Sequence, residues 1–295
     1  MGTKPKISYC SKIYVVYVGG AKMIGQTSNK EIISTWVKKN RVPHFIIIVG
    51  PKGSGKTCLT KYIAESIQAM YCVSDIKVDA IREIIDTAYT TTSKIVYHIK
   101  DADNMRPEAK NALLKITEEP PKSAYFVLSV ESDSVILNTL KSRSQILIMC
   151  PYKNQELKEY AEITYPECSF SKTLDLAVTP YFVDLLASYD QQEFLDYVNL
   201  VIENIGAVQP ANAFKSASKL KFKDTDEGFD LILFFRAFVS ICEKKIQDGF
   251  YENKWAEAII VTVPYIDWVG KLGVNKQQVY DSWVFDIREV LYDNN

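Results

Sequence analysis

The eight residues at 50–57 constrain the fold more than any other part of the chain. They read Gly-Pro-Lys-Gly-Ser-Gly-Lys-Thr and match G-x-x-x-x-G-K-[ST] at every fixed position. They follow a continuous apolar run at 44–49, typical of a strand buried on both faces, and they precede a segment with helical periodicity. In this context the pattern predicts a phosphate-binding loop, where glycines allow several backbone N–H groups to face one phosphate and a helix N-terminus adds partial positive charge.

Each position of this loop has an expected part in holding a nucleotide. Lys56 can reach the outer phosphates, and the hydroxyl of Thr57 can ligate Mg²⁺. The predicted nucleotide-binding residues are Gly50, Pro51, Lys52, Gly53, Ser54, Gly55, Lys56 and Thr57.

The first half of the chain alternates short apolar runs with amphipathic segments. Such alternation predicts an α/β domain with a mostly parallel sheet covered on both faces. Strands are expected at 13–18, 44–49, 76–78, 95–99, 125–129 and 145–149, and helices at 29–39, from the phosphate loop to about Met70, at 80–87 and at 106–117.

After Pro151 the pattern changes to helices. Three short helices are expected first and four longer ones follow, with no strong strand pattern among them. The expected helices lie at 156–163, 171–177, 181–189, 192–205, 228–247, 254–269 and 275–291.

Composition excludes several classes of protein. A chain of 295 residues suits two or three domains. No run of eighteen apolar residues occurs and the N-terminus lacks a signal-peptide pattern, so we expect a cytoplasmic protein with no membrane span. The six cysteines form no C-x-x-C pair, so neither a zinc site nor a disulfide framework is expected.

Charge is distributed unevenly along the chain. Residues 1–150 hold 21 Lys and Arg and 13 Asp and Glu, a net charge of +8, whereas the remainder has a net charge of −9. The first half is therefore better suited to face phosphates, although surface charge also varies between domains for no functional reason.

Further motifs surround the loop. They are Met23-Ile24-Gly25-Gln26, Pro43-His44-Phe45, the segment 76–84 (IKVDAIREI), Asp101-Ala102-Asp103-Asn104-Met105, Asn111-Ala112-Leu113-Leu114-Lys115, Glu118-Glu119-Pro120-Pro121 and the box 137–145 (LNTLKSRSQ). With these motifs the chain resembles the AAA+ clamp-loader subunits of bacterial DNA polymerase III, the delta-prime and tau/gamma subunits. The resemblance covers 23–145 well, the following helices moderately and the last hundred residues loosely.

The resemblance implies three domains. They are an AAA+ RecA-like P-loop core at 1–151, a small helical lid at 152–189 and an all-helical collar for oligomerisation at 190–295. It also implies ATP and Mg²⁺ as cofactors and a ring of five with other clamp-loader subunits (tau/gamma and delta). Such a ring opens a sliding clamp and places it on primed duplex DNA, which it contacts through the backbone.

The acidic motif departs from the family pattern. The family has Asp then Glu after the strand, one to hold Mg²⁺ and the other to align water. Here those positions carry Lys100 and Asp101. A lysine cannot ligate Mg²⁺, and Asp101 is one methylene shorter than Glu, so we expect weak or no hydrolysis, with Asp101 retained as a candidate catalytic residue.

Other family features are also altered. The sensor position after the strand at 125–129 offers Ser129, Val130 or Glu131 where Thr or Asn is usual. The lid's usual arginine would lie near Tyr181 and Phe182, where no basic residue occurs. The four-cysteine zinc module of many relatives is missing.

One basic residue of the family is retained. The resemblance implies that Arg143, in the box 137–145, is an arginine finger that reaches the ATP of a neighbouring subunit. The alternative for Arg143 is an ordinary surface ion pair.

Two further functions compete with a nucleotide-holding subunit. A motor ATPase of the tau/gamma kind is disfavoured by Lys100. A non-replicative P-loop switch or small-molecule kinase has no use for the motifs at 111–115 and 142–143, and it would need an arginine-rich substrate lid. Arg106 and Lys110 could touch DNA phosphates but are better interpreted as a solvated face, and His44 and His98 as hydrogen-bonded core residues.

Overall fold

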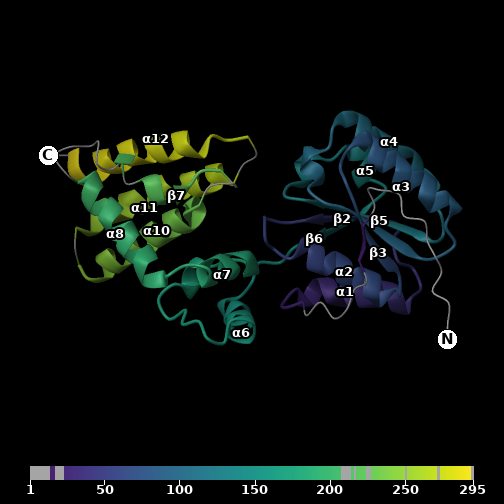
Figure 1. Cartoon of the computed structure of the whole chain (residues 1–295), viewed down its shortest axis with the longest axis horizontal. Coiled ribbons are helices and arrows are strands. Elements are labelled where there is room, and N and C mark those ends of the chain that lie inside the picture. The colour runs from purple at the N-terminus through teal and green to yellow at the C-terminus, as the bar shows by residue number, and fades with distance from the viewer. Residues whose placement is uncertain are drawn as a thin grey trace. The chain divides into compact units, whose positions relative to one another are not determined.

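The computed structural model describes residues 14–16, 23–206, 214–215, 217–223, 227–249, 251–270 and 273–293. It divides into two compact units, Met1–Glu156 and Leu157–Asn295 (Figure 1). The finer division into a core, a lid and a collar stays a prediction.

The first unit is built on a six-stranded sheet in the order β1-β3-β4-β5-β2-β6. Every pairing is parallel except that of β1 with β3, which confirms the expected mostly parallel α/β fold. The strands are β1 (Tyr14–Val16), β2 (Phe45–Val49), β3 (Met70–Ser74), β4 (Ile95–Ile99), β5 (Ala124–Val130) and β6 (Gln145–Ile148).

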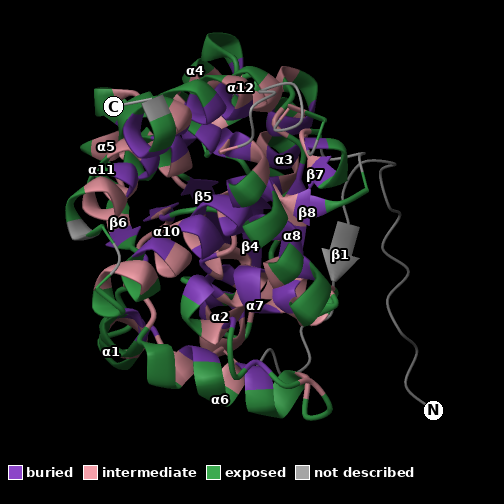
Figure 2. Ribbon diagram, turned by 90° about the vertical axis from the view of Figure 1, so that its left-hand side faces the viewer, coloured by how far each residue is buried: buried purple, intermediate pink, exposed green. Residues whose placement is uncertain are grey.

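Helices cover both faces of this sheet, with α1 and α2 on one side and α3 and α4 on the other (Figure 1). Alternate residues of one strand therefore enter different cores: Ile46 of β2 packs with residues of α1 and α2, and Ile47 with residues of α3 and α4. Strands β4 and β5 are buried along their whole length (Figure 2). The helices are α1 (Thr27–Lys38), α2 (Lys56–Ser66), α3 (Val78–Thr90), α4 (Pro107–Glu118) and the short α5 (Asn138–Lys141).

The prediction of a strand at 76–78 is wrong. Helix α2 ends at Ser66, and Gln68 then adopts a left-handed conformation with φ 55° that no helix can continue through. The strand is Met70–Ser74, paired in parallel with β4, and Asp75 turns the chain by accepting a hydrogen bond from the N–H of Ile76. Helix α3 then begins at Val78.

The second unit is mainly helical in the part that the structure describes. Its helices are α6 (Asn154–Thr164), which starts in the first unit, α7 (Pro180–Ala187), α8 (Gln191–Ile205), α10 (Leu231–Gln247), α11 (Glu252–Val269) and α12 (Lys276–Arg288). A π-helical turn, Glu289–Asp293, follows α12, and two short strands, β7 (Leu220–Lys221) and β8 (Phe229–Asp230), pair in parallel.

Two expectations for this unit need correction. The segment 171–177 contains only a 3₁₀ turn, η3 (Leu174–Leu176), because the flanking residues have non-helical backbones: Thr173 has a φ of −127° and Ala177 is extended with a ψ of 132°. The helix expected from 228 begins at Leu231, where Asp230 caps it by accepting hydrogen bonds from the N–H groups of Ile232 and Leu233.

Aromatic packing forms the centre of the second unit. Trp283 is fully buried on α12, donates a hydrogen bond to the hydroxyl of Thr262 at 3.0 Å and packs edge-on against Phe234 and Phe238 of α10. In contrast, Trp268 of α11 is 46% exposed. Among the described residues, no helix is long and apolar enough to cross a membrane.

Candidate nucleotide-binding site

The predicted phosphate loop joins β2 to α2 at the edge where parallel strands end. Gly53 and Gly55 have φ values of 76° and 86°, a conformation that side chains disfavour, and Gly55 is the N-terminal cap of α2. These two glycines let the backbone curl so that the N–H groups at the start of α2 face one concavity. The conformations of the two glycines are thus compatible with a phosphate-binding loop.

The side chain of Lys56 folds back onto the loop. Its ammonium donates hydrogen bonds to the carbonyl oxygens of Gly50 at 2.6 Å and of Pro51 at 3.0 Å. Burial lowers the pKa of Lys56, and the negative charges of Glu131, Asp103 and Asp101 act in the opposite direction. The cation is thus held at the mouth of the loop, where phosphate oxygens could replace the two carbonyls.

The buried hydroxyl of Ser54 indicates whether the loop fits a phosphate. Ser54 is 2% exposed, and its Oγ makes no hydrogen bond to any part of the chain that the structure describes. A buried hydroxyl without a partner costs free energy unless a ligand or water satisfies it. Together with the glycine conformations and Lys56, this orphan hydroxyl fits a bound phosphate group.

The altered acidic motif lies after β4. Lys100 follows the last residue of the strand, and Asp101 is exposed, with a left-handed backbone at φ 51° where it caps the 3₁₀ turn η1 (Ala102–Asn104). No group of three or more His, Cys, Asp or Glu within the described ranges could hold a metal ion. The hydroxyl of Thr57, at the start of α2, is one side chain that could ligate Mg²⁺ brought by phosphate oxygens.

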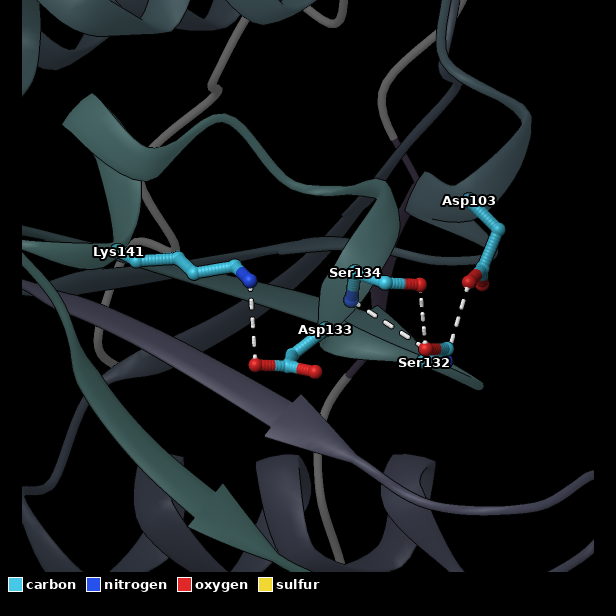
Figure 3. A network of polar contacts seen from close by, with 5 residues as sticks. All are labelled: Asp103, Ser132, Asp133, Ser134 and Lys141. Carbon is cyan, nitrogen blue, oxygen red and sulfur yellow. Dashed lines mark hydrogen bonds and ion pairs between the residues drawn. The ribbon is translucent and has the colours of Figure 1, made fainter.

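Asp103 has a structural part in this motif. Its carboxylate accepts hydrogen bonds from the N–H of Glu131 at 2.9 and 3.0 Å and from the N–H of Ser132 at 3.4 Å. Figure 3 shows the contact with Ser132, and beside it the ion pair of Asp133 with Lys141 at 3.2 Å. Asp103 thereby fixes the end of β5 next to the acidic motif.

The three sensor candidates have different surroundings. Ser129 is buried and hydrogen-bonded at 2.9 Å to His98, whose other ring nitrogen bonds to the hydroxyl of Tyr71 at 2.7 Å. Val130 is buried, and its carbonyl accepts from the N–H of Gly50 at 3.1 Å. This bond puts Glu131, the next residue, beside the phosphate loop; burial raises its pKa, whereas the charge of Lys56 lowers it.

Arg143 lies between α5 and β6. Its side chain is 40% exposed and forms an ion pair with Glu118 at 3.2 Å, while its other terminal nitrogen donates to the carbonyl of Thr139 at 3.0 Å. Both partners belong to the motifs at 118–121 and 137–145 and neither belongs to the phosphate loop. In the described contacts Arg143 is thus held by its own subunit in the way the surface ion-pair alternative expects.

The chain is similar to subunits of DNA polymerase III. The model of the family described as "DNA polymerase III, delta subunit" matches residues 68–153. The DNA polymerase III subunit gamma of Buchnera aphidicola is 31% identical in an alignment 153 residues long that covers 41% of this chain and 42% of that protein. The delta-prime subunit of Haemophilus influenzae is 38% identical in an alignment 76 residues long that covers 24% of this chain and 23% of that protein. The chain resembles AAA+ clamp-loader subunits.

A solved structure extends the likeness in fold. A gamma subunit-related protein from Thermotoga maritima aligns with a TM-score of 0.50 and 16% identity, covering 88% of this chain and 98% of that one. The chain spans less than half the length of both curated clamp-loader relatives. The match to the family model contains Lys100, Asp101 and Arg143, whereas the phosphate loop lies before it.

Sequence reasoning did not single out two residues that anchor the segment following β6. Gln26 is 3% exposed, and its amide forms two hydrogen bonds with the backbone of Cys150, at 2.7 and 2.9 Å. The motif at 23–26, of which Gln26 is the last residue, was the sequence feature that could have marked it. Tyr152 donates to the carbonyl of Ser54 at 2.9 Å, and no pattern in the sequence marks it.

Proposed function

We propose that the chain is a clamp-loader subunit that binds nucleotide at 50–57 and hydrolyses it weakly or not at all. One observation carries the proposal: a complete phosphate loop stands beside an acidic motif with Lys100 at the metal-acid position. The curated relatives named as gamma and delta-prime subunits of DNA polymerase III support the assembly.

The chain's own residues account for binding in this proposal. The N–H groups at the start of α2 and the ammonium of Lys56 would hold the phosphates of ATP, and Ser54 Oγ would gain its missing partner. The hydroxyl of Thr57 would be a ligand of Mg²⁺ that the phosphates bring with them. Lys100 supplies a positive charge where a carboxylate would otherwise hold the metal, and Asp101 reaches less far toward water than Glu, so binding is separated from turnover.

The remaining parts of the proposal concern the assembly. The chain would join tau/gamma and delta subunits in a ring of five, act on a sliding clamp at primed duplex DNA, and work in the cytoplasm. Arg143 would leave Glu118 and direct its guanidinium at the ATP of the neighbouring subunit, where a planar cation suits the charge on a transferred phosphoryl group.

A reconstituted complex tests the finger. Arg143→Ala should reduce the ATPase rate of the assembled ring by about 10³-fold at the site that it serves. The matched control is Arg41→Ala, since Arg41 is exposed and lies outside the site. Unchanged ATPase in the Arg143 variant would contradict the role of this residue without affecting the proposal of nucleotide binding.

An active motor ATPase of the tau/gamma kind is the second candidate, favoured by the complete loop and by Glu131 beside it. It predicts turnover by the isolated chain. Direct measurement of phosphate release with Mg²⁺ and ATP distinguishes the two.

A further inference from the structure

Residues 149–156, which we call the strap, follow β6 and contact both the start of α1 and the phosphate loop. At one end, Cys150 exchanges two backbone hydrogen bonds with the side chain of Gln26, at 2.7 and 2.9 Å. Nearby, Met149 packs so closely on Gly50 that an added Cβ there would lie 2.6 Å from Met149 Cβ. The strap therefore joins the start of α1 to the phosphate loop within the first unit.

Tyr152 makes the strap's direct hydrogen bond to the loop. Its hydroxyl donates to the carbonyl oxygen of Ser54 at 2.9 Å, and a Cβ added to Gly55 would come within 2.9 Å of the same hydroxyl. Burial raises the pKa of Tyr152 to about 12, so the hydroxyl stays protonated and can donate at any neutral pH. The contact thus falls on the peptide unit between Ser54 and Gly55.

The orientation of that peptide unit matters for phosphate binding. In a trans peptide the C=O and the N–H point in opposite directions. A hydrogen bond that holds the carbonyl of Ser54 toward Tyr152 therefore directs the N–H of Gly55 away from Tyr152, to the opposite side of the loop. Because Gly55 has a φ of 86° and no side chain, this peptide could otherwise rotate with little cost.

We infer that Tyr152 is a positioning residue of the nucleotide site, whose hydroxyl fixes the Ser54–Gly55 peptide so that the N–H of Gly55 faces a nucleotide phosphate. The inference rests on the proposed nucleotide binding. Its ligand class is a nucleoside di- or triphosphate, and the affected contact is with the phosphate group.

Tyr152→Phe tests it by removing only the hydroxyl. The Kd for Mg-ADP, measured by calorimetry on the full chain, should rise about five- to tenfold, as expected for one lost hydrogen bond. Displacement of a fluorescent ADP analogue by inorganic pyrophosphate should weaken by a similar factor, because the defect acts on the phosphates. A role limited to stability would lower the unfolding midpoint without changing either quantity at a temperature far below it.

Tyr89→Phe is the matched control. The hydroxyl of Tyr89 also donates to a backbone carbonyl of the same unit, that of Glu119 at 3.1 Å, with no contact to the loop. Its Kd should equal that of the unaltered chain. An unchanged Kd in Tyr152→Phe, or an equal loss in both variants, would overturn the inference and leave nucleotide binding intact; no binding by the unaltered chain would overturn both.

Discussion

The phosphate loop and the acidic motif lie at the same edge of one sheet. They differ in how many of the residues expected for nucleotide binding and hydrolysis each retains. The loop has both left-handed glycines, a lysine on two carbonyls and an orphan hydroxyl, which together fit a phosphate. The acidic motif has Lys100 at the metal position, an exposed Asp101 and an Asp103 whose carboxylate is used on the backbone of Glu131. Under the proposed function, holding a nucleotide and hydrolysing it therefore depend on separate residues, and the acidic motif can be altered while the loop stays intact.

Of the substitutions that test this comparison directly, we expect the largest effect from removing the lysine of the phosphate loop. Lys56→Ala should raise the Kd for ATP about 100-fold, because it deletes a charged donor worth roughly 2–3 kcal/mol to phosphate. Calorimetric titration measures it, with Lys38→Ala as the control, since Lys38 is exposed at the end of α1. Equal affinity in Lys56→Ala would show that the loop does not bind phosphate.

A second prediction concerns the strand beneath the altered motif. Burial first, and then the charges of Lys100, Lys56 and Lys61, lower the pKa of His98 to about 3. The unfolded chain, with a pKa near 6.5, then binds the proton that the folded chain rejects, so this contribution to stability is complete above pH 6.5 and is lost as pH falls toward 3. The free energy of unfolding should fall by about 1.5 kcal/mol between pH 6.5 and pH 5.

Urea unfolding at the two pH values checks this. His98→Asn should lack that part of the pH dependence, whereas His44→Asn, which alters the other histidine, should keep it. If the free energy of unfolding of the His98 variant fell by the same amount between pH 6.5 and pH 5, another group would have to titrate in this range.

A third prediction concerns variants that restore the expected carboxylates of the acidic motif. Lys100→Asp combined with Asp101→Glu should raise ATP turnover by about tenfold or more in the presence of Mg²⁺, because a metal-binding carboxylate and a longer water-aligning side chain are then both present. Phosphate release by the isolated chain is the measurement, and Lys94→Asp with Asp86→Glu provides a change of the same kind away from the site. Turnover that stays at background would show that the two residues are not what limits hydrolysis.

The smallest effect concerns the surface ion pair. Glu118→Gln should change the free energy of unfolding by less than about 0.5 kcal/mol, because both partners are substantially exposed. Because Arg143 would leave Glu118 to act on a neighbouring subunit, loss of this ion pair should alter the ATPase rate of a reconstituted ring by only a few-fold, and Glu119→Gln should not alter it. A large loss of stability would instead make Glu118 part of the fold.

Much of the first unit could be predicted from the sequence, because its periodicity reflects burial directly. Within the strand expected at 44–49, residues 45–49 are all apolar because alternate residues such as Ile46 and Ile47 enter different cores, and they form β2. The strand Met70–Ser74 was missed because the apolar residues at 62–72 continue a helical pattern, and only the left-handed Gln68 interrupts it.

The site itself was predictable only where a motif fixed the local backbone. The glycines of the phosphate loop are such a case, because the motif requires their backbone conformation. The contacts of Tyr152 with Ser54 and of Arg143 with Glu118 join residues 98 and 25 positions apart in the chain, so they depend on how the sheet brings β6 and α4 beside other elements. No short pattern contains that information.

Titration of the isolated chain with ATP, with and without Mg²⁺, followed by a turnover assay on the same sample, tests the central claim most directly. We predict binding without turnover, as an intact loop beside an altered acidic motif requires. Robust turnover would contradict the account and favour an active motor, and no binding would show that the loop at 50–57 has kept its shape without its ligand.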